Sequence, residues 1–179
     1  DLAYCGKGAW IAPTAVIKQP EKVSLDHYAY IDHYTRVASA LTMGKFAKIG
    51  SHCAIIGSPG HVTLEEFAEL APACQIVTGS NNYRGDDGLI AHGVPAAYAG
   101  NPVVGPVRIG AHALFALQSI ILEGTTIPEG LATGAQTLLK STMPLASWTL
   151  YAGNPARRIG ARDGTAILEK KKELLKELY

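Results

Sequence analysis

Histidine and cysteine side chains offer the first chemistry to consider, because they act as bases, nucleophiles or metal ligands near neutral pH. The six histidines are spread along the chain at His27, His33, His52, His61, His92 and His112. A catalytic zinc ion needs about three converging protein ligands, and the cysteines Cys5, Cys53 and Cys74 are far apart, without a CxxC pair. We therefore expect no metal, no disulfide framework and a reducing, cytoplasmic environment.

A period of six residues runs through most of the chain and must position these side chains. Bulky or β-branched residues start the hexapeptides at Leu25, Ile31, Val37, Met43, Ile49, Ile55, Leu64, Leu70, Ile76, Ile109, Phe115, Ile121, Ile127, Thr133 and Leu139. Helices repeat near 3.6 residues and strands at about 2, so neither explains this period. Hexapeptide repeats are typical of a parallel β-helix with three short strands in a coil of about 18 residues. The sequence thus predicts an all-β solenoid, whereas a β-sandwich would favour alternation with period 2.

Small residues follow many repeat starts, and two segments break the repeat. The small residues suit tight corners, and we expect the corners at Asp32, Gly50, Ala71, Gly110, Ala116 and Gly134. Residues 78–106 are rich in Gly, Asn, Asp and Pro and are predicted to form an excursion loop. Residues 162–179 carry spaced leucines among charges and are predicted to form a C-terminal amphipathic helix after a β-helix of residues 1–161.

Length and charge exclude several classes of protein. A chain of 179 residues with 47% hydrophobic content suits one domain. Its net charge of +1 gives no basic cluster for nucleic acid or an anionic membrane, and no apolar run approaches the roughly 20 residues of a membrane span. The first residue is Asp1, so we expect further residues to precede it in the full protein.

The hexapeptide starts and the segment GAQTLLKSTMPLASWTLYAGNPARRIG (residues 134–160) together resemble the left-handed β-helix hexapeptide acyltransferases. Within that family the chain is most similar to bacterial N-acetyltransferases of nucleotide-linked amino sugars in surface glycan (O-antigen or capsule) biosynthesis. The resemblance covers about residues 23–161, and AGNPARRIG at residues 152–160 is its most specific part. It implies a left-handed parallel β-helix, a homotrimer with active sites between subunits, and acetyl-CoA as cosubstrate.

The resemblance also suggests which residues hold CoA. Arg157 and Arg158 are suited to its phosphates, because planar guanidinium groups bind phosphate in a bidentate manner, and Lys140 adds a point charge. The small residues Ala116, Gly134 and Gly153 would let the pantetheine arm approach the backbone. The alternative is that both arginines are merely solvated after the last coil.

Asn81 occupies the position of the family's catalytic base. In the family's sugar and maltose acetyltransferases a histidine ends the pattern matched by LAPACQIVTGSN at residues 70–81, and the amino-sugar enzymes often have aspartate there. Asparagine accepts no proton at neutral pH, but a neutral amine attacks a thioester without a base. The departure therefore favours N-acylation over O-acylation, with Asn81 orienting the amine or the thioester carbonyl.

A histidine elsewhere in the sequence is the alternative source of a base. His52 and His61 are the best candidates, because they precede Asn81 by about one coil. His27 and His33 share a repeat position, His112 also follows a repeat start, and all three are expected at the surface, whereas His92 falls in the excursion loop.

The loop residues Asn82, Tyr83 and Arg84 are candidates for binding the acceptor, since an aromatic ring beside an arginine suits a sugar nucleotide. A loop stabilised by its own Asn and Asp turns explains the same residues equally well. The sequence leaves open which sugar, nucleotide and amino position is used, and whether the acyl group is acetyl or longer.

Three other functions remain as alternatives. A sugar O-acetyltransferase has the same fold, and a zinc carbonic anhydrase of this fold would need histidines five residues apart, which the chain lacks. A non-catalytic trimeric scaffold would explain Asn81, although it would not need the AGNPARR segment.

Overall fold

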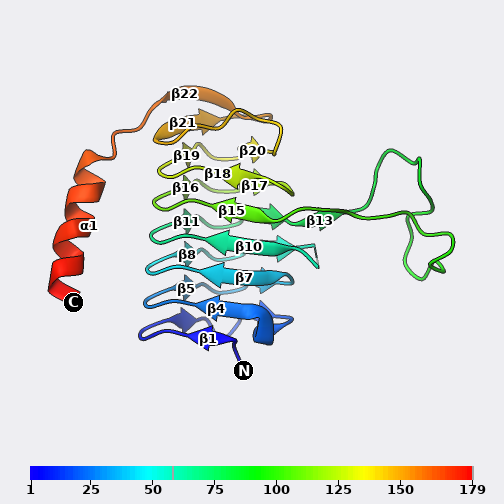
Figure 1. Ribbon diagram of the computed structural model, residues 1–179, viewed down its shortest axis with the longest axis horizontal. Helices are drawn as coiled ribbons and strands as arrows, with labels where there is room; N and C mark the ends of the chain where they lie inside the picture. The colour runs from blue at the N-terminus through cyan, green and yellow to red at the C-terminus, as the bar shows by residue number, and fades with distance from the viewer. Residues whose placement is uncertain (58, 179) are drawn as a thin grey trace.

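The computed structural model describes residues 1–57 and 59–178 and contains a parallel β-solenoid of about seven turns. Figure 1 shows the coils stacked from the N-terminus at one end to β22 at the other. Sheet A contains β1 (Tyr4–Cys5), β4 (Val23–Leu25), β7 (Ala40–Met43), β10 (His61–Leu64), β15 (Val107–Ile109) and β18 (Thr126–Ile127). The predicted fold class, a β-helix with an excursion loop and a C-terminal helix, is confirmed.

The other two sheets complete the triangular coil. Sheet B contains β2 (Trp10–Ile11), β5 (Tyr30–Ile31), β8 (Lys48–Ile49), β11 (Glu69–Leu70), β16 (Leu114–Phe115), β19 (Ala132–Thr133), β21 (Thr149–Ala152) and β22 (Arg157–Ala161). Sheet C contains β3 (Val16–Ile17), β6 (Arg36–Val37), β9 (Ala54–Ile56), β12 (Gln75–Val77), β17 (Ile120–Ile121) and β20 (Leu138–Leu139). A 3₁₀ turn at Pro20–Lys22 precedes β4. We call the corners between sheets the A–B, B–C and C–A corners.

The repeat starts form the core. Leu25, Ile31 and Ile49 are fully buried, and equivalent residues of successive coils pair in register, as Ile31 does with Ile49. Burial of stacked aliphatic side chains supplies the main stabilisation of such a coil. Met43 pairs with Leu64, so the break in the hexapeptide register is absorbed at the C–A corner between β9 and β10.

The small residues predicted for the corners do lie in them, directly after the strands, but the left-handed turn itself comes two residues later. At the A–B and B–C corners, the left-handed conformation falls three places after the repeat start, on large residues such as Tyr28, Phe46 and His52. This conformation costs a residue with a Cβ about 1–2 kcal/mol, but the side chains point outward and stack along the edge. The small residue after the repeat start has a different cause, because a Cβ at Gly50 would lie 2.7 Å from the Leu70 carbonyl oxygen of the next coil.

Stacked rings line the A–B corner and form what we call the aromatic ladder: Tyr28, Phe46, Phe67, His112 and Trp148. The ring centroids of the first four are 4.9 to 5.1 Å apart, and the step to Trp148 is 6.1 Å. The expectation that His112 is a surface residue is wrong. Its side chain is 5% exposed, because Phe67 and Trp148 cover its two faces.

Helix α1 (Thr165–Leu178) packs along the ladder and runs back toward the N-terminal coils (Figure 1). The Lys171 ammonium contacts the Glu66 carboxylate and lies 5.8 Å from the centre of the Phe67 ring. Before the helix, the Arg162 guanidinium donates to the carbonyl oxygens of His112 at 2.7 Å and Gly130 at 3.0 Å. Within the described ranges, no helix has the length and apolar character needed to cross a bilayer.

His112 should make stability depend on pH. Burial lowers the pKa of its imidazole, and the nearby Lys171 cation adds to the effect. As the pH falls below the unfolded value of about 6.5, the unfolded chain takes up a proton before the folded chain does. Stability is therefore complete above that pH and declines below it. We expect His112→Phe, which keeps a ring in the ladder, to lose less thermal stability than the wild type between about pH 7.5 and 5.5. Equal losses in the two proteins would contradict this role.

Candidate active site

The excursion loop leaves the coil at the C–A corner as a hairpin of β13 (Gly79–Ser80) and β14 (Val103–Val104), and projects away from the body (Figure 1). Its root is rigid, because the buried Thr78 hydroxyl donates to the Gly57 carbonyl oxygen at 2.5 Å. A Cβ at Gly57 would lie 2.2 Å from the Gly79 nitrogen, so only glycine fits against the hairpin.

A hollow of about 390 Å³ lies at this root, and we call it the loop-base depression. Its lining comprises Ile56, Val77, Gly79, Ser80, Asn81, Tyr83, Pro102 and Val104. Asn81 thus stands where the hairpin meets the outer surface of sheet C. The mixture of apolar side chains and one amide suits a small group that carries both methyl and polar atoms.

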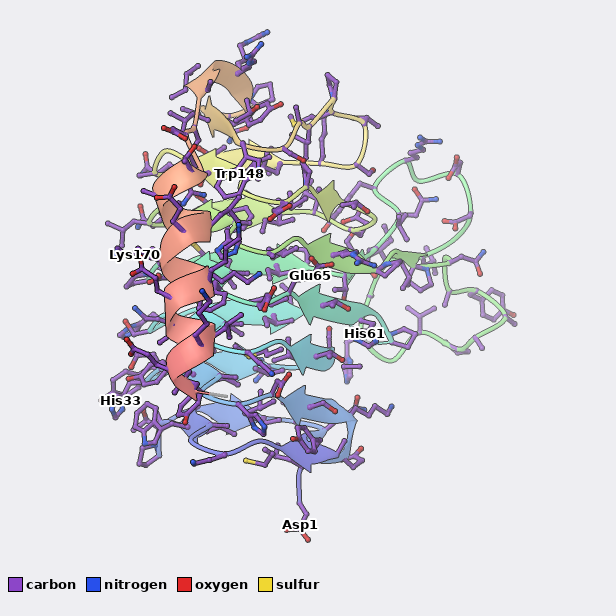
Figure 2. All side chains as sticks on the ribbon, turned by 60° about the vertical axis from the view of Figure 1, so that its left-hand side comes forward. Asp1, His33, His61, Glu65, Trp148 and Lys170 are labelled. Atoms are coloured by element: carbon purple, nitrogen blue, oxygen red, sulfur yellow. The ribbon has the colours of Figure 1, made fainter. Side chains whose placement is uncertain are left out.

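The two histidines considered as bases lie on different parts of the coil, His52 before β9 and His61 at the start of β10. His52 lies at the B–C corner, where its ring centroid is 5.0 Å from that of Tyr34. His61 lies on sheet A, on the side from which the loop departs (Figure 2), and its Nε2 is 3.1 Å from the Thr42 hydroxyl. The structure therefore does not bring them together, and neither of them lines the loop-base depression.

Replacing His61 with alanine should leave turnover within about twofold of the wild type, because the ring bonds to Thr42 on another face and general bases must reach the transferred proton. Steady-state kinetics with a saturating acceptor measure this directly. A loss of about a hundredfold or more, with an unchanged melting temperature, would instead establish His61 as the base.

The acceptor candidates in the loop are of two kinds. The Asn82 amide donates to the Asp86 carboxylate at 2.7 Å, and its oxygen accepts from the Arg84 backbone N–H at 3.0 Å. Asn82 is thus engaged in the loop's own structure. Tyr83 is 82% exposed and the Arg84 side chain is also exposed, so both are available to a ligand.

Further out in the loop, Asp87 connects its two arms by a hydrogen bond. Its carboxylate accepts from the Asn101 backbone N–H at 2.8 Å, and hydrogen bonds led by this one lower the pKa of Asp87. A carboxylate that is held in this way keeps the two arms of the loop together.

The three small residues Ala116, Gly134 and Ala152 stand one per coil at the B–C corner. Their backbone is held from inside by hydroxyl groups: the Ala116 N–H donates to the Thr133 hydroxyl at 3.1 Å, and the Ser119 hydroxyl donates to the Ala116 carbonyl oxygen at 2.7 Å. The sequence prediction for a pantetheine arm named Ala116 and Gly134 together with Gly153, which directly follows Ala152, and this role stays a prediction.

Beside this column lies a larger hollow of about 660 Å³, which we call the corner depression. Its lining comprises Ala73, Gln75, Gln118, Ile120, Ala135, Gln136, Gly153 and Asn154. The Gln136 amide donates to the Gln118 amide oxygen at 3.0 Å, which fixes both side chains at its rim. Of the predicted CoA residues only Gly153 lines it, and the glutamines were missed because isolated amides carry no spacing signal.

The predicted cations lie toward the C-terminal end of the coil. Arg157 and Arg158 are exposed on β22 and line a hollow of about 590 Å³ with Pro144, Ala146, Thr149, Tyr151 and Ala156. The Tyr151 hydroxyl shapes this hollow by donating to the Pro144 carbonyl oxygen at 3.1 Å. Lys140 is exposed just after β20. Across residues 1–57 and 59–178, no three His, Cys, Asp or Glu side chains gather as a metal site would require.

Comparisons with known proteins agree with this geometry. No protein-family model matches the chain. The chain is 25% identical over 169 residues to dTDP-4-amino-4,6-dideoxy-D-glucose acyltransferase of Escherichia coli, covering 88% of this chain and 81% of that protein. It also superposes on AntD, an N-acyltransferase from Bacillus cereus solved with dTDP and 3-hydroxybutyryl-CoA, with a TM-score of 0.89, 26% identity and coverage of 99% and 92% of the two chains.

A more distant neighbour shares the fold alone. The hexapeptide-repeat acetyltransferase of Vibrio cholerae, solved with acetyl-CoA, gives a TM-score of 0.60 at 13% identity, over 90% of this chain and 72% of that chain. Together the comparisons confirm the resemblance that the hexapeptide repeat and the AGNPARRIG segment indicated.

Proposed function

We propose that this chain, which has the hexapeptide-repeat acyltransferase fold, is an acyl-CoA-dependent N-acyltransferase that acts on a dTDP-linked amino sugar. One observation carries the proposal. On β12, Gln75 lines the corner depression and Val77 lines the loop-base depression, so the two hollows adjoin on one face of sheet C. Alternate residues of a strand lie about 7 Å apart on the same face. A thioester in one hollow and an amine in the other would therefore meet above a single strand.

The reaction itself needs little from the protein. The neutral amine attacks the thioester carbonyl carbon, a C–N bond forms and the C–S bond breaks, and the amine proton passes to the departing thiolate to give the free thiol. Asn81 has no basic atom, and we assign it to orienting the amine or the carbonyl group. We assign the small-residue column, Lys140, Arg157 and Arg158 to the donor, and Tyr83 and Arg84 to the acceptor.

The setting of the reaction is part of the same proposal. We take the protein to be a cytoplasmic homotrimer in surface glycan biosynthesis, with its sites between subunits. The exposed apolar side chains of the projecting loop, among them Leu89 and Tyr98, support a partner subunit there, because isolated proteins seldom expose many of them on one segment. The free thiols of Cys53 and Cys74, both buried, are compatible with a reducing compartment.

A thioester screen tests the proposed function. Acetyl-CoA and 3-hydroxybutyryl-CoA are each incubated with dTDP-4-amino-4,6-dideoxyglucose, and thiol release and the mass of the sugar product are recorded. We expect an amide product with at least one thioester, and saturable CoA binding by calorimetry. A protein that binds neither CoA nor the sugar nucleotide would be a scaffold, and the proposal would fail.

A further inference from the structure

Exposed rings collect at the B–C corner of the N-terminal coils. Tyr34 is 62% exposed, and its ring is 5.0 Å from the His52 ring and 6.0 Å from the His33 ring. Trp10 continues this surface, with a centroid 5.8 Å from that of His33. The backbone beneath is held firmly, because Tyr34 and His52 adopt the left-handed corner conformation and the His52 N–H donates to the His33 carbonyl oxygen. A fixed, exposed ring surface of this kind is suited to stacking against a planar heterocycle.

Arg36 follows Tyr34 by two residues and is exposed on the outer side of sheet C. It is the only charged residue in the six strands of that sheet. Among the described residues, no hydrogen bond or ion pair engages its side chain. A cation without a partner on an otherwise uncharged face has nothing in the folded chain to neutralise it, and its guanidinium matches phosphate oxygens in charge and geometry.

The path from these residues to the loop-base depression is short and open. Arg36 pairs in register with Ala54 of β9, whose methyl group leaves room beside the guanidinium. Ile56, two residues along the same strand, lines the depression. From His52 to Gly57 the chain covers about 16 Å at about 3.3 Å per residue, and an extended ribose and diphosphate are suited to bridging such a path.

We propose that the nucleoside diphosphate of the acceptor lies along this path, with its base against the Tyr34–His52 rings and its diphosphate on Arg36. The amino sugar then reaches the loop-base depression near Asn81. This inference rests on the proposed function. In this arrangement the acceptor binds to the coils on the N-terminal side of β12 and the donor to the coils on its C-terminal side, so the two substrates do not compete for one surface.

Binding of dTDP alone tests the inference separately from catalysis. We expect Arg36→Met to weaken dTDP binding by about tenfold or more, because a charged hydrogen-bonded contact is lost. The acceptor KM should rise similarly, while kcat and the acyl-CoA KM stay within about twofold. Lys7→Met, which removes an exposed cation at the A–B corner, is the matched control and should change neither value.

Tyr34→Leu and His52→Leu supply the second arm. Each should raise the dissociation constant of dTDP by about fivefold or more, since the base loses an aromatic ring to stack on, and each should leave kcat unchanged. If Arg36→Met bound dTDP as tightly as the wild type does, the inference would be overturned, even if the amino sugar is acylated. Absence of acyl transfer by a wild type whose dTDP binding does depend on Arg36 would instead overturn the proposed function alone.

Discussion

Replacing Ala135 with tryptophan is expected to abolish use of the acyl donor while the fold survives. Ala135 is exposed and lines the corner depression directly beside Gly134. An indole there would fill the space that we assign to the pantetheine arm, and no buried atom would have to move. We expect kcat/KM for acyl-CoA to fall by at least about a hundredfold, which corresponds to about 2.7 kcal/mol.

Two measurements identify the cause of that loss. Calorimetry should show that CoA no longer binds, whereas dTDP binding stays as in the wild type. Thr126→Trp is the control, because it adds the same ring to the same coil on the exposed side of sheet A and should retain activity. Normal acyl-CoA kinetics in Ala135→Trp would show that the donor lies elsewhere.

The largest loss of stability is expected from Gly130→Ala. Gly130 has φ of +67° and lies under the Trp148 ring, and a Cβ added there would be 2.3 Å from a ring carbon. The ring cannot easily move, because the Arg162 guanidinium lies 5.7 Å from its centre and Gly164 also lies close against it. Backbone strain and overpacking together should lower the free energy of unfolding by about 3 kcal/mol.

Gly124→Ala separates the two causes. Gly124 has φ of +71°, yet its nearest neighbour would be 3.6 Å from the added Cβ, so this variant carries only the backbone strain, about 1 kcal/mol. Chemical denaturation of both variants gives the difference. Combining Gly130→Ala with Trp148→Ala should cost less than the sum of the two single changes, because the clash is then removed. Equal losses in Gly124→Ala and Gly130→Ala would contradict this account of the ladder.

The sequence predicts the coil because its cause is local and periodic. The side chain of each repeat start points into the core. The spacing of the aliphatic residues therefore predicts the strands, the break in the register after Ile55 and the point where the loop leaves the coil. The left-handed position within each corner was not predicted, because residues such as Tyr28, Phe46 and His52 occupy it, and a large side chain gives no glycine-like signal for that conformation. Likewise, the burial of His112 depends on Trp148 and α1, which lie far along the chain.

The site was less predictable than the coil. Asn81 was placed by its resemblance to a known motif, and Arg157 and Arg158 by the segment that contains them. By contrast, Gln118, Gln136 and Arg36 carry no motif. A single arginine becomes conspicuous only when the strands are assigned to faces and sheet C proves otherwise uncharged.

The most direct test of the central claim compares an amine with a hydroxyl group at the same carbon of the same sugar nucleotide. With acyl-CoA supplied in excess, the rates of thiol release are measured for dTDP-4-amino-4,6-dideoxyglucose and for its 4-hydroxyl counterpart. Because no basic side chain lines the loop-base depression, we predict acylation of the amine at a rate at least about a hundredfold above that of the hydroxyl group. If the hydroxyl sugar were acylated efficiently and the amino sugar were not acylated, the account would be contradicted.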